Sequence, residues 1–131
     1  MRLLLDTHLV IAVVNEAPER LSTEHRKTLA DSSHNFVAST ASLWEIAIKF
    51  RLGKLPLRIE PGSLAAYLDA SAIEVLPVTA EHATLEALPI PETRDPFDRL
   101  LLAICQVEQL SLLTIDRALV SHPLAWPIHP A

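Results

Sequence analysis

The sequence predicts an α/β fold: a single domain over residues 1–131 in which a parallel β-sheet of four to five strands is sandwiched between helices. First, short apolar runs alternate with segments of helical spacing along the chain. Second, the strand-like runs are continuously apolar, as expected of strands covered on both faces. Third, 131 residues, half of them apolar, suffice for one core, and no repeat, low-complexity tract or linker divides the chain.

The first half of the chain predicts two strands and their helices. "RLLLD" (2–6) is an apolar run that stops at an acid, so it predicts a buried strand, and "HLVIAVV" (8–14) predicts a helix or turn after it. "ERLSTEHRKTLADSS" (19–33) has helical spacing with a polar face. "HNFVAST" (34–40) predicts a second strand, and "ASLWEIAIKFRLG" (41–53) a helix ended by its glycine.

The second half continues the alternation after a proline-rich connection. "LAAYLDASA" (64–72) predicts a short helix, "IEVLPV" (73–78) a third strand and "AEHATLEAL" (80–88) another helix. "FDRLLLAICQVEQ" (97–109) predicts a helix, and "LSLLTID" (110–116) a fourth strand. The remaining residues predict a short helical piece and a last edge strand at 126–128.

Composition indicates which cell compartment and which kinds of partner to expect for this protein. The only cysteine, Cys105, lies in an apolar helical run, which suits a reducing compartment. No segment approaches the roughly 18 apolar residues of a membrane span, so we expect a cytoplasmic protein without a membrane partner. The net charge of −5 argues against whole-surface binding of nucleic acid, although residues 49–58 carry four basic side chains and no acid.

Four acidic side chains are expected near one edge of the sheet. Asp6 and Asp116 directly follow predicted strands, Glu45 lies one turn into a helix that follows a strand, and Asp98 lies in the first turn of another helix. In parallel α/β sheets, ligands collect beyond the carboxyl ends of the strands. The four carboxylates are therefore candidates for one site.

Each acid also has a purely structural explanation. Asp6 and Asp116 could begin turns, as aspartate often does after strands. Ser42 and Glu45 spell a capping box, and Glu45 has Lys49 four residues later as an ion-pair partner.

The stretch "DPFD" has a structural explanation of its own. With Asp95 at the N-cap, Pro96 first in the helix and Asp98 third, it would cap the helix and favour its dipole.

Taken jointly, the acids point to a cation. Four carboxylates at one edge repel one another unless a positive charge lies between them. Carboxylate oxygens are the ligands that Mg²⁺ and Mn²⁺ prefer, and such ions support phosphodiester hydrolysis without a side-chain nucleophile. In that hypothesis Asp98 is a metal ligand and Asp95 alone caps the helix.

Four segments, in this order, resemble a known family. They are "LLLDTH" (3–8), "ASTASLWEIAIKFRLGKL" (38–55), "RDPFDRLLLAICQ" (94–106) and "LLTIDRAL" (112–119). This ordered set, spread over essentially the whole chain, is similar to that of the PIN-domain ribonucleases, and within them to the VapC-type toxins of toxin–antitoxin pairs.

The resemblance implies a site and an activity. It implies that Asp6 and Asp98 are the principal metal ligands, with Glu45 and Asp116 direct or water-mediated ligands. It places Thr7 and Ser39 beside them as small hydroxyl residues. It further implies a Mg²⁺- or Mn²⁺-dependent endoribonuclease, a homodimer, an RNA substrate and a cognate antitoxin.

Two further expectations concern the surroundings of this site. Lys49, Arg51 and Lys54 are expected to contact either RNA phosphates or the antitoxin. Similar proteins usually have histidine before "RDPFDR", where this chain has Thr93, so a role for that histidine is in doubt here while the acids are not affected.

Other functions remain open at this stage. A metal-free ribonuclease would need an acid–base pair among the six histidines, which are His8, His25, His34, His82, His122 and His129. A receiver domain would need an aspartate ending its third strand, and a haloacid-dehalogenase-type phosphatase a D-x-D motif; this sequence has neither. A catalytically silent PIN fold that only binds or regulates is the remaining alternative.

Overall fold

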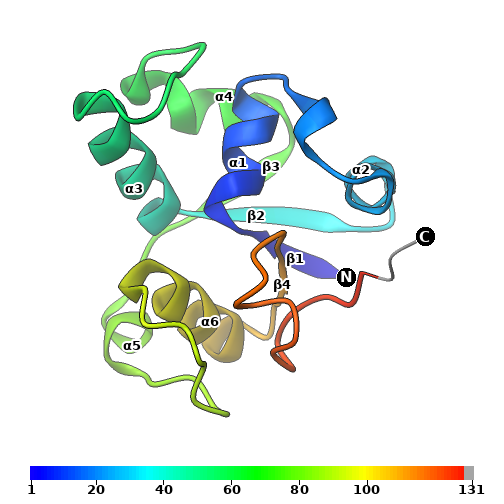
Figure 1. Cartoon of the computed structure of the whole chain (residues 1–131), viewed down its shortest axis with the longest axis vertical. Coiled ribbons are helices and arrows are strands. Elements are labelled where there is room, and N and C mark those ends of the chain that lie inside the picture. The colour runs from blue at the N-terminus through cyan, green and yellow to red at the C-terminus, as the bar shows by residue number, and fades with distance from the viewer. Residues whose placement is uncertain (129–131) are drawn as a thin grey trace.

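The structure, a computed structural model, describes residues 1–128 and contains a four-stranded, fully parallel sheet in the order β3-β2-β1-β4 (Figure 1). The strands are β1 (Arg2–Leu5), β2 (Asn35–Ser39), β3 (Ile73–Leu76) and β4 (Ser111–Leu113). The predicted α/β class and the four predicted strands are confirmed.

Six α-helices surround the sheet. They are α1 (Thr7–Val14), α2 (Thr23–Ala30), α3 (Thr40–Arg51), α4 (Leu64–Ala70), α5 (Ala80–Thr84) and α6 (Pro96–Glu108). Two are shorter than the sequence pattern predicts. The expected helix 19–33 is divided into a 3₁₀ turn at Pro18–Arg20 and α2, and the expected helix 80–88 ends at Thr84.

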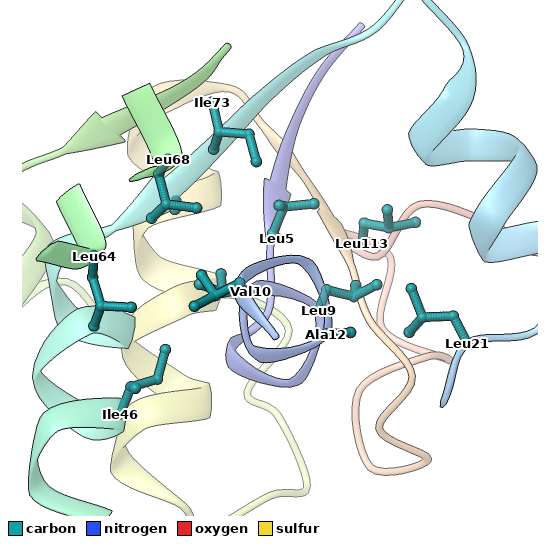
Figure 2. Packing of buried hydrophobic residues seen from close by; sticks show 12 residues of the cluster. Leu5, Leu9, Val10, Ala12, Leu21, Ile46, Leu64, Leu68, Ile73 and Leu113 are labelled. Atoms are coloured by element: carbon teal, nitrogen blue, oxygen red, sulfur yellow. The ribbon is translucent and has the colours of Figure 1, made fainter. Parts of the chain in front are cut away.

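The sheet separates two apolar cores, as its sequence pattern predicts. Along β1, Leu5 belongs to the core under α1, α3 and α4, whereas its neighbour Leu4 belongs to the core under α5 and α6. In Figure 1 the two groups of helices lie on opposite sides of the sheet. Figure 2 shows the first core, in which Leu5 and Leu113 from the strands face Leu9 of α1. Continuous apolar strands thus result from burial on both faces.

The predicted last edge strand at 126–128 is wrong. The chain pairs with β4 only through an isolated parallel bridge between Leu112 and Ala125, in which the Trp126 amide donates to the Leu112 carbonyl at 2.8 Å. The next acceptor of a ladder, the Thr114 carbonyl, instead contacts the His25 ring at 2.9 Å. Residues 129–131, including His129, lie outside the described residues.

Three further features belong to the described part of the fold. Within residues 1–128, no helix combines the length and the apolar character needed to cross a membrane. Cys105 of α6 is fully buried, and burial raises the pKa of its thiol. Gly53 ends α3 with a φ of 72°, as expected.

Helix α6 ends on a residue with an unfavourable backbone. Gln109 is exposed and has a φ of 58° and a ψ of 45°, the left-handed region in which a side chain is disfavoured. We expect Gln109→Gly to raise the free energy of unfolding by about 1 kcal/mol, measured by urea denaturation.

Ala66→Gly is the matched control, because this exposed residue lies inside α4. There glycine should cost about 1 kcal/mol. If both substitutions destabilise the protein, the left-handed backbone at Gln109 carries no strain.

Candidate active site

The strand order fixes where a ligand site can form. The chain moves from β1 outward to β2 and β3, and then returns to place β4 on the other side of β1. The connections leaving β1 and β4 therefore diverge, and a crevice opens beyond their carboxyl ends. Asp6 directly follows β1, and Asp116 lies in the loop after β4.

Asp6 is a buried carboxylate that connects three segments. Its Oδ1 accepts a hydrogen bond from the Leu9 amide at 3.0 Å, so that Asp6 caps α1. Its Oδ2 accepts from the Thr114 hydroxyl and, at 3.3 Å, from the Ile115 amide. Only 2% of the residue is exposed, and burial raises the pKa of its carboxyl despite these donors.

Thr114 is a residue of the site that the sequence analysis missed. Its hydroxyl donates to Asp6 and accepts from the Asp116 amide at 3.0 Å, so it joins the ends of β1 and β4. The expectation that Asp116 directly follows a strand is wrong, because β4 ends at Leu113 and two residues intervene. The sequence held one signal that could have identified Thr114. It is a hydroxyl residue next to the end of a strand, as Thr7 is after β1.

Glu45 lies in the second turn of α3 and is 7% exposed. Its Oε1 accepts from the Thr7 hydroxyl at 2.8 Å, and its Oε2 accepts from the Lys49 ammonium at 2.7 Å. Thr7 also contacts the Ser42 hydroxyl at 3.0 Å. These bonds place Glu45 against the residue that follows Asp6.

The capping box predicted for Ser42 and Glu45 is wrong. Helix α3 begins earlier, at Thr40, and the buried Ser39 is its N-cap, accepting from the Ala41 amide at 3.0 Å. The predicted Glu45–Lys49 pair is confirmed. Ser39 thus holds the start of the helix that carries Glu45.

The two aspartates of "DPFD" have different surroundings. Asp95 caps α6 as predicted, because its Oδ1 accepts from the amides of Phe97 at 2.8 Å and Asp98 at 3.4 Å. Asp98 is half-buried, and its Oδ2 accepts from the Thr93 hydroxyl at 3.2 Å. Thr93 therefore interacts directly with a candidate site residue.

The electrostatics of Asp98 place it near the other acids. Burial, followed by the carboxylates of Asp95, Asp116 and Glu45, raises the pKa of Asp98 to about 6. The Asp6–Thr114–Asp116 and Thr7–Glu45 contacts bring three of the predicted acids to the edge of the sheet at β1 and β4, and the charges of Asp116 and Glu45 act on the fourth, Asp98. Their negative charges are close enough to oppose one another.

The candidate ligand atoms suit a hard divalent cation, but the side chains are not arranged as a complete metal-binding site. All four candidates offer carboxylate oxygens, the ligands preferred by Mg²⁺ and Mn²⁺. Within residues 1–128, however, no three His, Cys, Asp or Glu side chains are grouped closely enough to hold an ion. Asp6 and Glu45 instead bond to Thr114, Thr7 and Lys49.

The predicted basic contacts have two different environments. The ammonium group of Lys49 forms an ion pair with Glu45, so Lys49 belongs to the acidic site itself. Arg51 and Lys54 are exposed, and no described acidic side chain pairs with either.

Four of the histidines in the described part of the chain contact other groups. His25 bonds to Ser22 and to the Thr114 carbonyl, His82 closes the cap of α5, and His122 contacts the Pro89 carbonyl. His34 packs edge-on against Trp126. No two of them are hydrogen-bonded to each other.

Comparison with known proteins agrees with this fold. The model of the family described as PIN domain matches residues 3–122. Among solved structures, a chain of VapBC2 from Rickettsia felis, bound to a DNA fragment from its promoter, superposes with a TM-score of 0.57 and 16% identity. The match covers 95% of this chain and 96% of that one. No curated protein sequence matches.

Neutralising Asp98 should stabilise the protein when metal is absent. Its folded pKa, about 6, lies above the unfolded value of 3.8, so its contribution to stability is fully present below about pH 4 and is lost as the pH rises through about 6. In EDTA, Asp98→Asn should therefore leave the melting temperature unchanged near pH 4 and raise it near pH 7.5. Exposed Asp69→Asn is the control, expected to show no such pH-dependent gain.

Replacing Asp95 with alanine should destabilise the protein, in contrast to replacing Asp98 with asparagine. Asp95→Ala leaves two amides of α6 without their acceptor and should lower the free energy of unfolding by about 0.5–2 kcal/mol, measured by urea denaturation. Asp95→Asn retains the cap and should be close to wild type. Equal losses in both variants would show that the charge, rather than the cap, is what stabilises the helix.

Proposed function

This chain belongs to the PIN-domain family, and from that premise we propose that it is a divalent-metal-dependent endoribonuclease that acts as the toxin of a toxin–antitoxin pair. The observation that carries the proposal is the gathering of Asp6, Glu45, Asp98 and Asp116 at the β1–β4 edge. Burial, followed by the carboxylates of Asp95, Asp116 and Glu45, raises the pKa of Asp98 to about 6, so neighbouring acids repel its charged form. A divalent cation would remove that repulsion.

In this proposal Asp6 and Asp98 are the principal ligands, and Glu45 and Asp116 bind directly or through water. A bound Mg²⁺ or Mn²⁺ supplies Lewis-acid polarisation of a phosphoryl oxygen and lowers the pKa of a water molecule. Thr114 orients Asp6. Glu45 or Asp116 would accept the proton of the attacking water.

The substrate and the partners are also part of the proposal. A site with four carboxylates and one ammonium group, that of Lys49, repels an RNA phosphate when no metal ion is bound, so binding and cleavage both require the metal. The structural similarity to a chain of VapBC2 supports a cognate antitoxin, and we extend this to a cytoplasmic homodimer. Arg51 and Lys54 would contact the RNA or the antitoxin outside the acidic site.

A catalytically silent PIN fold is the second candidate. It is favoured by one observation: Asp6 and Glu45 already have protein partners, and no three acids are grouped as metal ligands within residues 1–128. A silent protein would show no metal-dependent stabilisation, whereas a nuclease would, because a ligand bound only to the folded state stabilises it.

Metal should control both stability and activity. We expect the melting temperature to rise with Mg²⁺ concentration and single-stranded RNA to be cleaved in Mg²⁺ but not in excess EDTA. Asp6→Asn and Asp98→Asn should each reduce kcat/KM at least about 100-fold while the far-ultraviolet circular dichroism is unchanged. Asp69→Asn, remote from the site, should cleave like wild type.

Undiminished cleavage in EDTA would refute the metal mechanism. In that case, replacement of the histidines one at a time would identify an acid–base pair. A wild-type protein that Mg²⁺ does not stabilise and that cleaves no RNA would instead support the silent fold.

A further inference from the structure

A continuous groove adjoins the carboxylate site. Its larger part, about 720 Å³, lies between the start of α2 and the loop after β4, and its lining includes Arg20, Ile115 and Arg117. Its smaller part, about 300 Å³, includes His8, Arg20 and Ile115. Because Arg20 and Ile115 line both parts, we treat them as one depression, the Arg20 groove. Each part has the size of a ligand-binding pocket.

The groove lies beside the proposed catalytic residues. The amide of Ile115, which lines both parts of the groove, donates to Asp6 at 3.3 Å. His8 is two residues beyond Asp6, and Arg117 directly follows Asp116. A chain bound at the carboxylates is therefore within reach of the groove.

Buried hydrogen bonds fix the wall of the groove. The His25 ring lies between the Ser22 hydroxyl at 2.6 Å and the Thr114 carbonyl at 2.9 Å, and the residue is 7% exposed. These contacts attach the start of α2 to the residue that orients Asp6. The groove is thus formed before any ligand binds.

The charges of the groove suit a polyanion. Arg20 and Arg117 are exposed, and no acidic side chain among residues 1–128 forms an ion pair with either. The acid in the lining, Glu24, is paired with Lys27 at 3.6 Å. By contrast, Lys49 of the basic stretch is bound to an acid. On a chain with net charge −5, two unpaired arginines beside an acidic site form a local positive surface.

The remaining exposed lining has both apolar and polar side chains. Ile115 is 36% exposed and Val120 is 48% exposed, and both line the larger part of the groove. Apolar side chains can support the flat faces of unpaired bases, a contact that every base can make. The exposed hydroxyl residues Ser22 and Thr23 line the same part of the groove.

We propose that the Arg20 groove holds the single strand of RNA next to the scissile bond, with Arg20 and Arg117 on successive phosphates and Ile115 and Val120 under the bases. This proposal rests on the nuclease function above. It assigns affinity, not catalysis, to the two arginines.

The test compares three substitutions that each remove one positive charge. Arg20→Gln, Arg117→Gln and Arg2→Gln are assayed for cleavage of a labelled single-stranded RNA of about 12 nucleotides in Mg²⁺, at several salt concentrations. Arg2 is the control, since it lies at the opposite, amino end of β1 and pairs with Glu74 at 3.2 Å.

We expect each groove variant to raise KM roughly three- to tenfold while kcat stays within about twofold, because phosphate contacts add to binding uniformly. The slope of log(1/KM) against log salt should fall by about 0.7 for each arginine removed. Arg2→Gln should change neither quantity. A fall in kcat at constant KM would contradict the assignment.

The outcomes separate this proposal from the nuclease function. If wild type cleaves RNA and the groove variants behave like Arg2→Gln, only the groove proposal fails. If wild type neither binds nor cleaves RNA, both fail. If the variants keep the wild-type KM for RNA but bind an oligoglutamate peptide more weakly, the groove is a site for an acidic protein segment and the RNA assignment is overturned.

Discussion

The carboxylate of Asp6 is buried at the one edge of the sheet where the connections diverge. Burying an ionisable group is costly unless hydrogen bonds replace its hydration. Here the amides of Leu9 and Ile115 and the hydroxyl of Thr114 replace it, and each donor comes from a segment that must be positioned for the site to exist. One side chain therefore starts α1, joins β1 to the loop after β4 and presents a negative charge to the crevice.

The acidic side chains near Asp6 lower the stability of the fold, although the proposed function requires them. Burial and, after it, the carboxylates of Asp95, Asp116 and Glu45 disfavour the charged form of Asp98, which is why its pKa lies above its ordinary value. Lys49 offsets part of this charge by lying against Glu45. Sites that concentrate like charges are commonly kept for what they bind, since a neutral residue would give a more stable fold.

Local sequence patterns were enough to predict most of the architecture. Continuous apolar runs predicted the parallel strands, and "DPFD" predicted the cap at Asp95, because both depend on contacts between neighbours in sequence. One detail that failed depends on a distant contact, because strand β4 ends before Asp116 where Thr114 turns toward Asp6. The other is local: α3 begins at Thr40 because Ser39, rather than Ser42, caps it. The roles of the four acids remain a proposal, and the groove could not be predicted because Arg20 and Arg117 are far apart in the chain.

Cys105 lies in the core between the sheet and α6, fully buried and with a thiol whose pKa is raised. The thiolate is the form that reacts with maleimides and oxidants, so the native sulfur is inert in the folded protein. As it is the only cysteine in the chain, a new one placed on an exposed helix would be the single reactive thiol. Fluorophores or spin labels can therefore be attached at one chosen position without removing a core residue.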